Sequence, residues 1–198
     1  MRPESYRHVI TALWSAWGLY WLLSALGNKG TVRRESLASR LAYVLPLFVG
    51  GVLMLSSQLP WEWLNARLWP RSLAAYWIGV ALLATGLAFS VWARVHLGRN
   101  WSGSVTVKQG HELIRTGPYG YVRHPIYTGL SAAVLGTAIA FGTMRAMLGA
   151  LIIVASFLFK LRLEEVFMRE TFPDQYPGYA ATVPRLIPFT RPQRSSVR

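Results

Sequence analysis

The residues with the clearest chemical potential lie in two short segments of the C-terminal half. The first, 123–127, reads Arg-His-Pro-Ile-Tyr, and the second, 160–165, begins with lysine and ends in two adjacent glutamates. A carboxylate beside aromatic rings suits a bound cation, whereas a helix start offers free N–H groups and a positive dipole end to an anion. Together the two segments could bind one small molecule that carries charges of both signs.

The spacing within these segments predicts helices. Pro125 suits the first position of a helix, because its missing N–H would be unpaired there, and His124 is then the cap. Lys160 and Glu164 are four apart and share one helical face. Since adjacent residues point in different directions, at most one of Glu164 and Glu165 is expected to face the loop before Pro125. The alternative is structural: a simple Pro-started helix and an ordinary solvated helix end.

Uncharged runs predict the elements that position these segments. The chain is 53% apolar and only 15% charged, and its apolar residues are gathered rather than scattered. Five runs contain no Asp, Glu, Lys or Arg: 9–27, 41–59, 72–93, 125–144 and 146–159. The first four reach the ~20 residues that a helix needs to cross hydrocarbon. The shorter fifth is expected to continue as helix through Lys160. We therefore expect an all-α integral membrane bundle of about five transmembrane helices, whose last two form a hairpin.

The charge distribution predicts a topology. The net charge is +13, and sixteen of the 21 cations fall on one side of the predicted bundle. By the positive-inside rule, the C-terminus and the loop at 94–124 are cytoplasmic and the N-terminus is outside. Membrane lipids account for the basic charge better than nucleic acid does, because no basic helix or nucleic-acid motif is present.

The chain is interpreted as a single membrane domain, 1–198, in three parts. Residues 1–93 supply three transmembrane helices, 94–189 form a core with a cytoplasmic loop and the helical hairpin, and 190–198 form a disordered basic tail. The sequence contains no cysteine, which excludes disulfides, zinc thiolate sites and a cysteine nucleophile. No metal is expected in the site.

Between about Arg94 and Phe189 the sequence resembles the isoprenylcysteine carboxyl methyltransferase family, within the wider group that includes phospholipid N-methyltransferases. The ordered motifs that carry the resemblance are His-Glu-Leu-Ile at 111–114, Gly-Pro-Tyr at 117–119, Arg-His-Pro-Ile-Tyr-Thr-Gly at 123–129, Glu164-Glu165, Tyr-Pro-Gly-Tyr at 176–179 and Val-Pro-Arg-Leu-Ile-Pro at 183–188. The resemblance implies methyl transfer from S-adenosyl-L-methionine to a lipidic small-molecule substrate reached from the bilayer.

The resemblance also implies roles for individual residues. It assigns cofactor contacts to His111, Glu112, Leu113, Ile114, Tyr119, His124, Pro125, Ile126, Tyr127 and Glu164. In the family an arginine contacts the substrate where this chain has Lys160. Arg123 and Lys160 would steer a carboxylate acceptor, whereas an amine acceptor would need a base, for which His124 or Glu165 is the candidate.

The sequence leaves the methyl acceptor open between a carboxylate, most favoured on an isoprenylcysteine-like molecule, and a phospholipid or other small amine or thiol. Two other classes are also possible. An NADPH-dependent enzyme similar to sterol reductases would share the loop and hairpin, and a non-catalytic membrane subunit would keep the hairpin for stability alone. Against the last stands the gathering of His, Tyr, Arg and Glu near lipid, which costs free energy to maintain.

Overall fold

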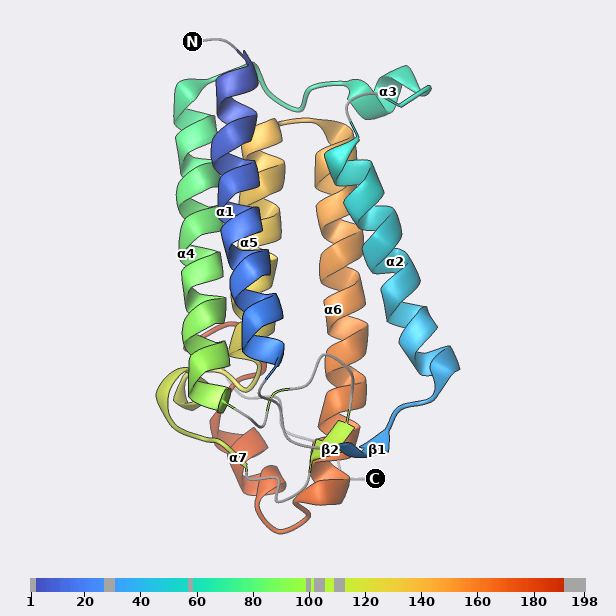
Figure 1. The fold of residues 1–198 in the computed structure, drawn as a ribbon, viewed down its shortest axis with the longest axis vertical. Coiled ribbons are helices and arrows are strands. Elements are labelled where there is room, and N and C mark those ends of the chain that lie inside the picture. The colour runs from blue at the N-terminus through green and yellow to red at the C-terminus, as the bar shows by residue number, and fades with distance from the viewer. Residues whose placement is uncertain are drawn as a thin grey trace.

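The computed structural model describes residues 3–26, 31–56, 59–98, 101, 106–108 and 113–190. Within these ranges the chain forms a bundle of long helices with short elements at both ends (Figure 1). The elements are α1 (Pro3–Ala25), β1 (Thr31–Arg34), α2 (Leu37–Leu55), α3 (Glu62–Asn65), α4 (Leu73–Leu97), β2 (Thr106–Lys108), the 3-10 helix η2 (Gly117–Gly120), α5 (Pro125–Phe141), α6 (Met144–Thr171) and α7 (Tyr176–Thr182).

The long helices alternate in direction along the bundle. Figure 1 shows the N-terminal end of α1 at one end of the molecule, whereas α7 and the β1–β2 pair lie at the other. The start of α5 and the end of α6 also lie at the α7 end, so the predicted hairpin is confirmed. Which end faces the cytoplasm stays a prediction from the charge distribution.

The all-α class is confirmed, with one small addition. β1 and β2 form a two-stranded antiparallel sheet that pairs Thr31 with Lys108 and Arg34 with Thr106. This sheet ties the connection before α2 to the loop after α4. No alternation of apolar and polar residues indicated these strands, because each is only three or four residues long.

Three described helices are long and apolar enough to cross a membrane: α2, α4 and α6. The apolar α5 has 17 residues and is shorter than a full span. α1 has 23 residues but carries Glu4 and Arg7 in its first turns. The count of about five spans therefore stays a prediction. The continuation of the fifth run is confirmed, because α6 passes through Lys160 and ends only at Thr171.

Close backbone contacts hold α4 against α5. A Cβ atom added to Gly86 would lie 2.5 Å from the carbonyl oxygen of Gly129, and one added to Gly79 would lie 2.5 Å from that of Gly136. Two helices can approach this closely only where neither carries a side chain. The glycine that ends the 123–129 motif is thus a packing residue, and it fixes α5 directly above the candidate site.

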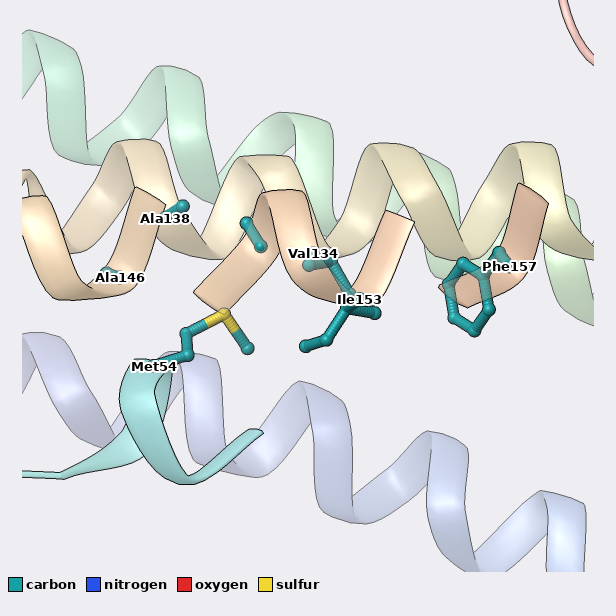
Figure 2. Close-up of a cluster of buried hydrophobic side chains, with 7 residues drawn as sticks. Met54, Val134, Ala138, Ala146, Ile153 and Phe157 are labelled. Atoms are coloured by element: carbon teal, nitrogen blue, oxygen red, sulfur yellow. The ribbon is translucent and has the colours of Figure 1, made fainter. Parts of the chain in front are cut away.

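A second contact line joins α2 to α6. Gly50 and Gly149 face each other, and a Cβ on Gly50 would lie 2.7 Å from the Gly149 oxygen. Figure 2 shows Met54 of α2 near Val134 of α5 and Ile153 of α6, with Phe157 further along α6, and all four belong to one buried apolar cluster. The hairpin therefore forms the centre of the bundle, with α4 on one side and α2 on the other (Figure 1).

We predict that Gly129→Ala destabilises the bundle by about 1–3 kcal/mol, because the new methyl group would overlap the Gly86 oxygen and lie 2.8 Å from the Ser90 nitrogen. Gly51→Ala on α2 is the matched control, since a Cβ there meets nothing within 4 Å. Thermal unfolding of both variants in detergent, followed by tryptophan fluorescence, measures the difference. Equal midpoints for the two variants would contradict the packing role.

Candidate functional site

The entry to α5 is built as the sequence predicts. Gly117 adopts a positive φ of 59° and opens the turn η2, and Pro125 is the first residue of α5. His124 is the cap residue, but its side chain makes no capping hydrogen bond. The imidazole of His124 is therefore free to turn toward α6, where it meets the two glutamates.

Glu165 is the most heavily bonded side chain of the site. Its Oε1 accepts hydrogen bonds from Nε and Nη2 of Arg123, at 3.0 and 2.7 Å, and from Nε of Arg185 at 3.1 Å. Its Oε2 accepts from Nη2 of Arg185 at 2.5 Å, and Nε2 of His124 lies 3.3 Å from Oε1. The Glu165 side chain is only 4% exposed. One buried carboxylate thus joins α6, the turn before α5 and the segment after α7.

Backbone contacts fix the segment after α7 against the same turn. The amide of Arg123 donates to the Pro184 oxygen at 2.9 Å, and the amide of His124 donates to the Arg185 oxygen at 3.1 Å. Arg123 Nη1 donates to the oxygens of Ala180 and Val183, at 2.8 and 2.6 Å. Each of the three guanidinium nitrogens of Arg123 is therefore already bonded within the protein, and its side chain is 3% exposed.

Glu164 has a different environment. The Tyr127 hydroxyl donates to its Oε1 at 2.5 Å, His124 Nδ1 lies 3.7 Å from Oε2, and Lys160 Nζ lies 3.9 Å from Oε1. The Glu164 side chain is 22% exposed, five times more than that of Glu165. Its contacts with His124 and Lys160 are longer than any contact of Glu165, and its side chain is more exposed, so Glu164 is the carboxylate that can receive a ligand cation.

The expectation that at most one of the two glutamates faces the loop before α5 is wrong. His124 contacts both, Glu164 through Nδ1 and Glu165 through Nε2. Successive side chains on a helix diverge by about 100°, and the imidazole lies within the arc between them. The two carboxylates therefore act on one ring from two sides.

Their combined effect decides the charge of His124. Burial lowers the pKa of His124, but hydrogen bonds from its ring to Glu164 and Glu165 and the negative charges of both carboxylates outweigh burial, so that the pKa is raised above its usual value. A protonated imidazole can donate to both glutamates at once. The site thus favours the charged form of His124.

Lys160 lies between two aromatic rings. Its Nζ is 5.0 Å from the ring centre of Tyr43 and 5.6 Å from that of Tyr127, distances at which a cation is attracted to a ring face. The Tyr43 hydroxyl donates to Glu35 at 2.5 Å. Sequence reasoning missed Tyr43, which lies outside the region of resemblance. The available signal was that Tyr43 is the single tyrosine of α2.

The remaining predicted cofactor contacts are divided between two apolar clusters. Ile114 packs with Tyr119 and Ile126 against α4, whereas Leu113 packs against Tyr176 and Tyr179 of α7. His111 and Glu112 lie outside the described residues.

Arg185 is the second functional residue that sequence reasoning missed. It lies in the Val-Pro-Arg-Leu-Ile-Pro motif, which carried the resemblance without an assigned role. Its importance follows only from the tertiary contact with Glu165.

We predict that Glu165→Gln destabilises the folded protein by about 3–5 kcal/mol, because it leaves the buried Arg123 guanidinium without its counter-charge. Asp174→Asn, an exposed position in the turn after the same helix, is the control and should shift the unfolding midpoint little. Thermal unfolding in detergent compares the two. A Glu165→Gln midpoint within error of the control would show that the ion pair does not stabilise the fold.

The raised pKa of His124 predicts a pH-dependent stability. A raised folded-state pKa contributes stability that is fully present below the unfolded value of about 6.5 and is lost as pH rises through the folded value. The midpoint difference between wild type and His124→Asn should therefore be largest below about pH 6.5 and should shrink at alkaline pH. Unfolding scans across this range measure it, and a difference that grows with pH would reverse the assignment.

Comparison with known proteins gives this geometry a family. A family model described as phospholipid methyltransferase matches residues 74–175, just over half of the chain. The chain is 34% identical over 99 residues to a protein-S-isoprenylcysteine O-methyltransferase of Schizosaccharomyces pombe, covering 48% of this chain and 42% of that protein. It is 27% identical over 120 residues to protein-S-isoprenylcysteine O-methyltransferase B of Arabidopsis thaliana, covering 58% of this chain and 61% of the relative.

A probable protein-S-isoprenylcysteine O-methyltransferase of Oryza sativa subsp. indica is 27% identical over 177 residues, which cover 86% of this chain and 88% of that protein. The chain spans less than two thirds of the length of the yeast and Arabidopsis relatives. The family match includes all of α5 and α6 and nearly all of α4, and therefore both glutamates and the Arg-His-Pro turn. The resemblance seen in the sequence is confirmed, and the chain belongs to the phospholipid methyltransferase family.

Proposed function

We propose that this chain is an S-adenosyl-L-methionine-dependent methyltransferase that esterifies the carboxylate of an isoprenylcysteine-like lipid at the membrane surface. The observation that carries the proposal is the position of Glu164, a partly exposed carboxylate between Tyr127, His124 and Lys160 where the α5–α6 hairpin opens. The names of the relatives support the same chemistry.

The donor set fits the cofactor. Glu164 supplies a counter-charge for the ammonium and sulfonium groups, and the rings of Tyr127 and Tyr43 supply faces that attract cations. The first turn of α5, which begins at Pro125, has backbone N–H groups without partners inside the helix, and these can donate to an anionic group. When bound, S-adenosyl-L-methionine supplies a methyl group activated by the sulfonium, which becomes a neutral thioether on transfer.

A carboxylate acceptor suits the residues better than an amine does. An ionised carboxylate is already nucleophilic, so the protein needs only to align it and exclude water, with Lys160 as the nearby cation. Arg123, the other predicted steering cation, is enclosed and fully bonded, so we assign it to positioning His124 and Glu165 rather than to the acceptor.

An amine acceptor would require a base, and neither candidate is suited. Both oxygens of Glu165 accept hydrogen bonds from arginine. Burial alone would lower the pKa of His124, but the two glutamates raise it, so the protonated ring is favoured. A general base needs a free lone pair near neutral pH. Phospholipid or other amine methylation is therefore the weaker alternative, and a nicotinamide-dependent reduction has no observation in its favour.

The relatives are named for a protein-bound isoprenylcysteine, so we favour a lipidated chain end over a free lipidic small molecule as the acceptor. We place the site at the cytoplasmic face, because the α7 end of the bundle carries most of the predicted cationic loops. The exposed apolar side chains of α2, such as Leu45 and Phe48, suit contact with acyl chains.

We predict that Glu164→Gln weakens binding of S-adenosylhomocysteine about 10- to 100-fold, because the cofactor's ammonium loses its counter-charge. Asp174→Asn removes an exposed carboxylate from the turn after the same helix and should leave binding unchanged. Calorimetric titration of both purified variants measures this, with NADPH as the ligand that should not bind. Unaltered affinity in Glu164→Gln would refute the assignment.

The reaction itself is tested by incubating the protein in membranes with methyl-labelled S-adenosyl-L-methionine. A carboxyl methyl ester releases its label as methanol in base, whereas an N-methyl group does not. Base-stable label would favour the amine alternative. If the protein binds the cofactor but no lipid becomes labelled, neither a carboxylate nor an amine of these membranes is its methyl acceptor.

A further inference from the structure

Two guanidinium groups of the site share one carboxylate. Arg123 and Arg185 both bind Glu165, whereas Lys160 lies beside Glu164 and over the ring of Tyr43, which donates to Glu35. The Glu165 cluster therefore carries one positive charge more than its carboxylate compensates. Excess positive charge in a partly buried cluster favours the binding of a further anion.

Arg185 is the member of this cluster with unused hydrogen-bonding capacity. Its side chain is 27% exposed, whereas that of Arg123 is 3% exposed. Nε and Nη2 of Arg185 hold Glu165, but Nη1 makes no hydrogen bond to any residue in the described ranges. The backbone contact between the His124 amide and the Arg185 oxygen holds this guanidinium at the edge of the site.

We propose that Nη1 of Arg185 binds a ligand carboxylate in the methyl-transfer site, an inference that rests on the proposed function. Because Glu165 occupies the other edge of the guanidinium, the contact is a single charge-assisted hydrogen bond on an arm already fixed in place. Two ligands of the proposed reaction carry a carboxylate: the amino-acid portion of the cofactor and the methyl acceptor. Pre-organisation by Glu165 lowers the entropy lost when either one binds.

The experiment compares Arg185→Gln with Arg162→Gln, which removes an exposed cation from α6 three residues before Glu165. Calorimetry measures the affinities of S-adenosylhomocysteine and of its analogue without the carboxylate. Steady-state kinetics with an N-acylated S-isoprenylcysteine measures KM and kcat. Thermal unfolding of each variant reports folding, and Arg185→Lys tests rescue by a cation without the fork.

Two outcomes support the proposal and identify the source of the carboxylate. If the cofactor supplies it, Arg185→Gln weakens S-adenosylhomocysteine about 10- to 100-fold and leaves the decarboxylated analogue unchanged. If the acceptor supplies it, S-adenosylhomocysteine and its decarboxylated analogue both bind normally, while KM for the acceptor rises by a similar factor and kcat is retained. Arg162→Gln should change none of these values.

Other outcomes overturn it. Arg185 would be only a structural partner of Glu165 if Arg185→Gln weakened S-adenosylhomocysteine and its decarboxylated analogue equally and also lowered the unfolding midpoint. Unchanged affinities and KM would overturn the inference while the proposed function stands. Failure of the wild-type protein to bind S-adenosylhomocysteine would instead overturn the proposed function, and this inference with it.

Discussion

The ion pairs of Glu165 join three parts of the chain: α6, the turn before α5 and the segment after α7. Removing a carboxylate from water costs several kcal/mol, and this cost is offset only where the surrounding donors are numerous and well directed. Here two guanidinium groups and one imidazole converge on it, from Arg123, Arg185 and His124. The same turn also pairs its amides with the oxygens of Pro184 and Arg185, so the end of the hairpin is closed by polar contacts in addition to the apolar packing around Tyr119 and Tyr179. The geometry around Glu164 depends on this closure.

Arginines at the opposite end of the bundle have a different task. Arg145 donates to the oxygens of Ser56 and Met54, and Arg7 donates to that of Leu55 at 3.5 Å. The last carbonyl groups of a helix lack partners within that helix, and cations there also interact favourably with its dipole. Arg145 and Arg7 therefore cap the C-terminal end of α2.

The parts of the site that the sequence predicted are those set by local rules. A proline fixes the start of α5, and the uncharged run before Lys160 continues as helix because nothing in it breaks the hydrogen-bonding pattern. Tyr43 and Arg185 could not be found in this way, since each reaches the site from a distant segment through side-chain contacts alone. The prediction for the two adjacent glutamates was wrong for a related reason. Helical spacing gives the directions of their side chains, but it does not give the position of the His124 ring between them.

The position of Tyr43 also bears on why lysine occupies residue 160. A compact ammonium fits between the rings of Tyr43 and Tyr127, where the planar guanidinium of an arginine would need more room and would present its charge through a fork. Lys160 thus places a compact positive charge near Glu164, between rings supplied by α2 and α5. Because α2 supplies one of the two rings, the helices before residue 94 do more than anchor the core in lipid. They help to hold the cation that would meet the acceptor.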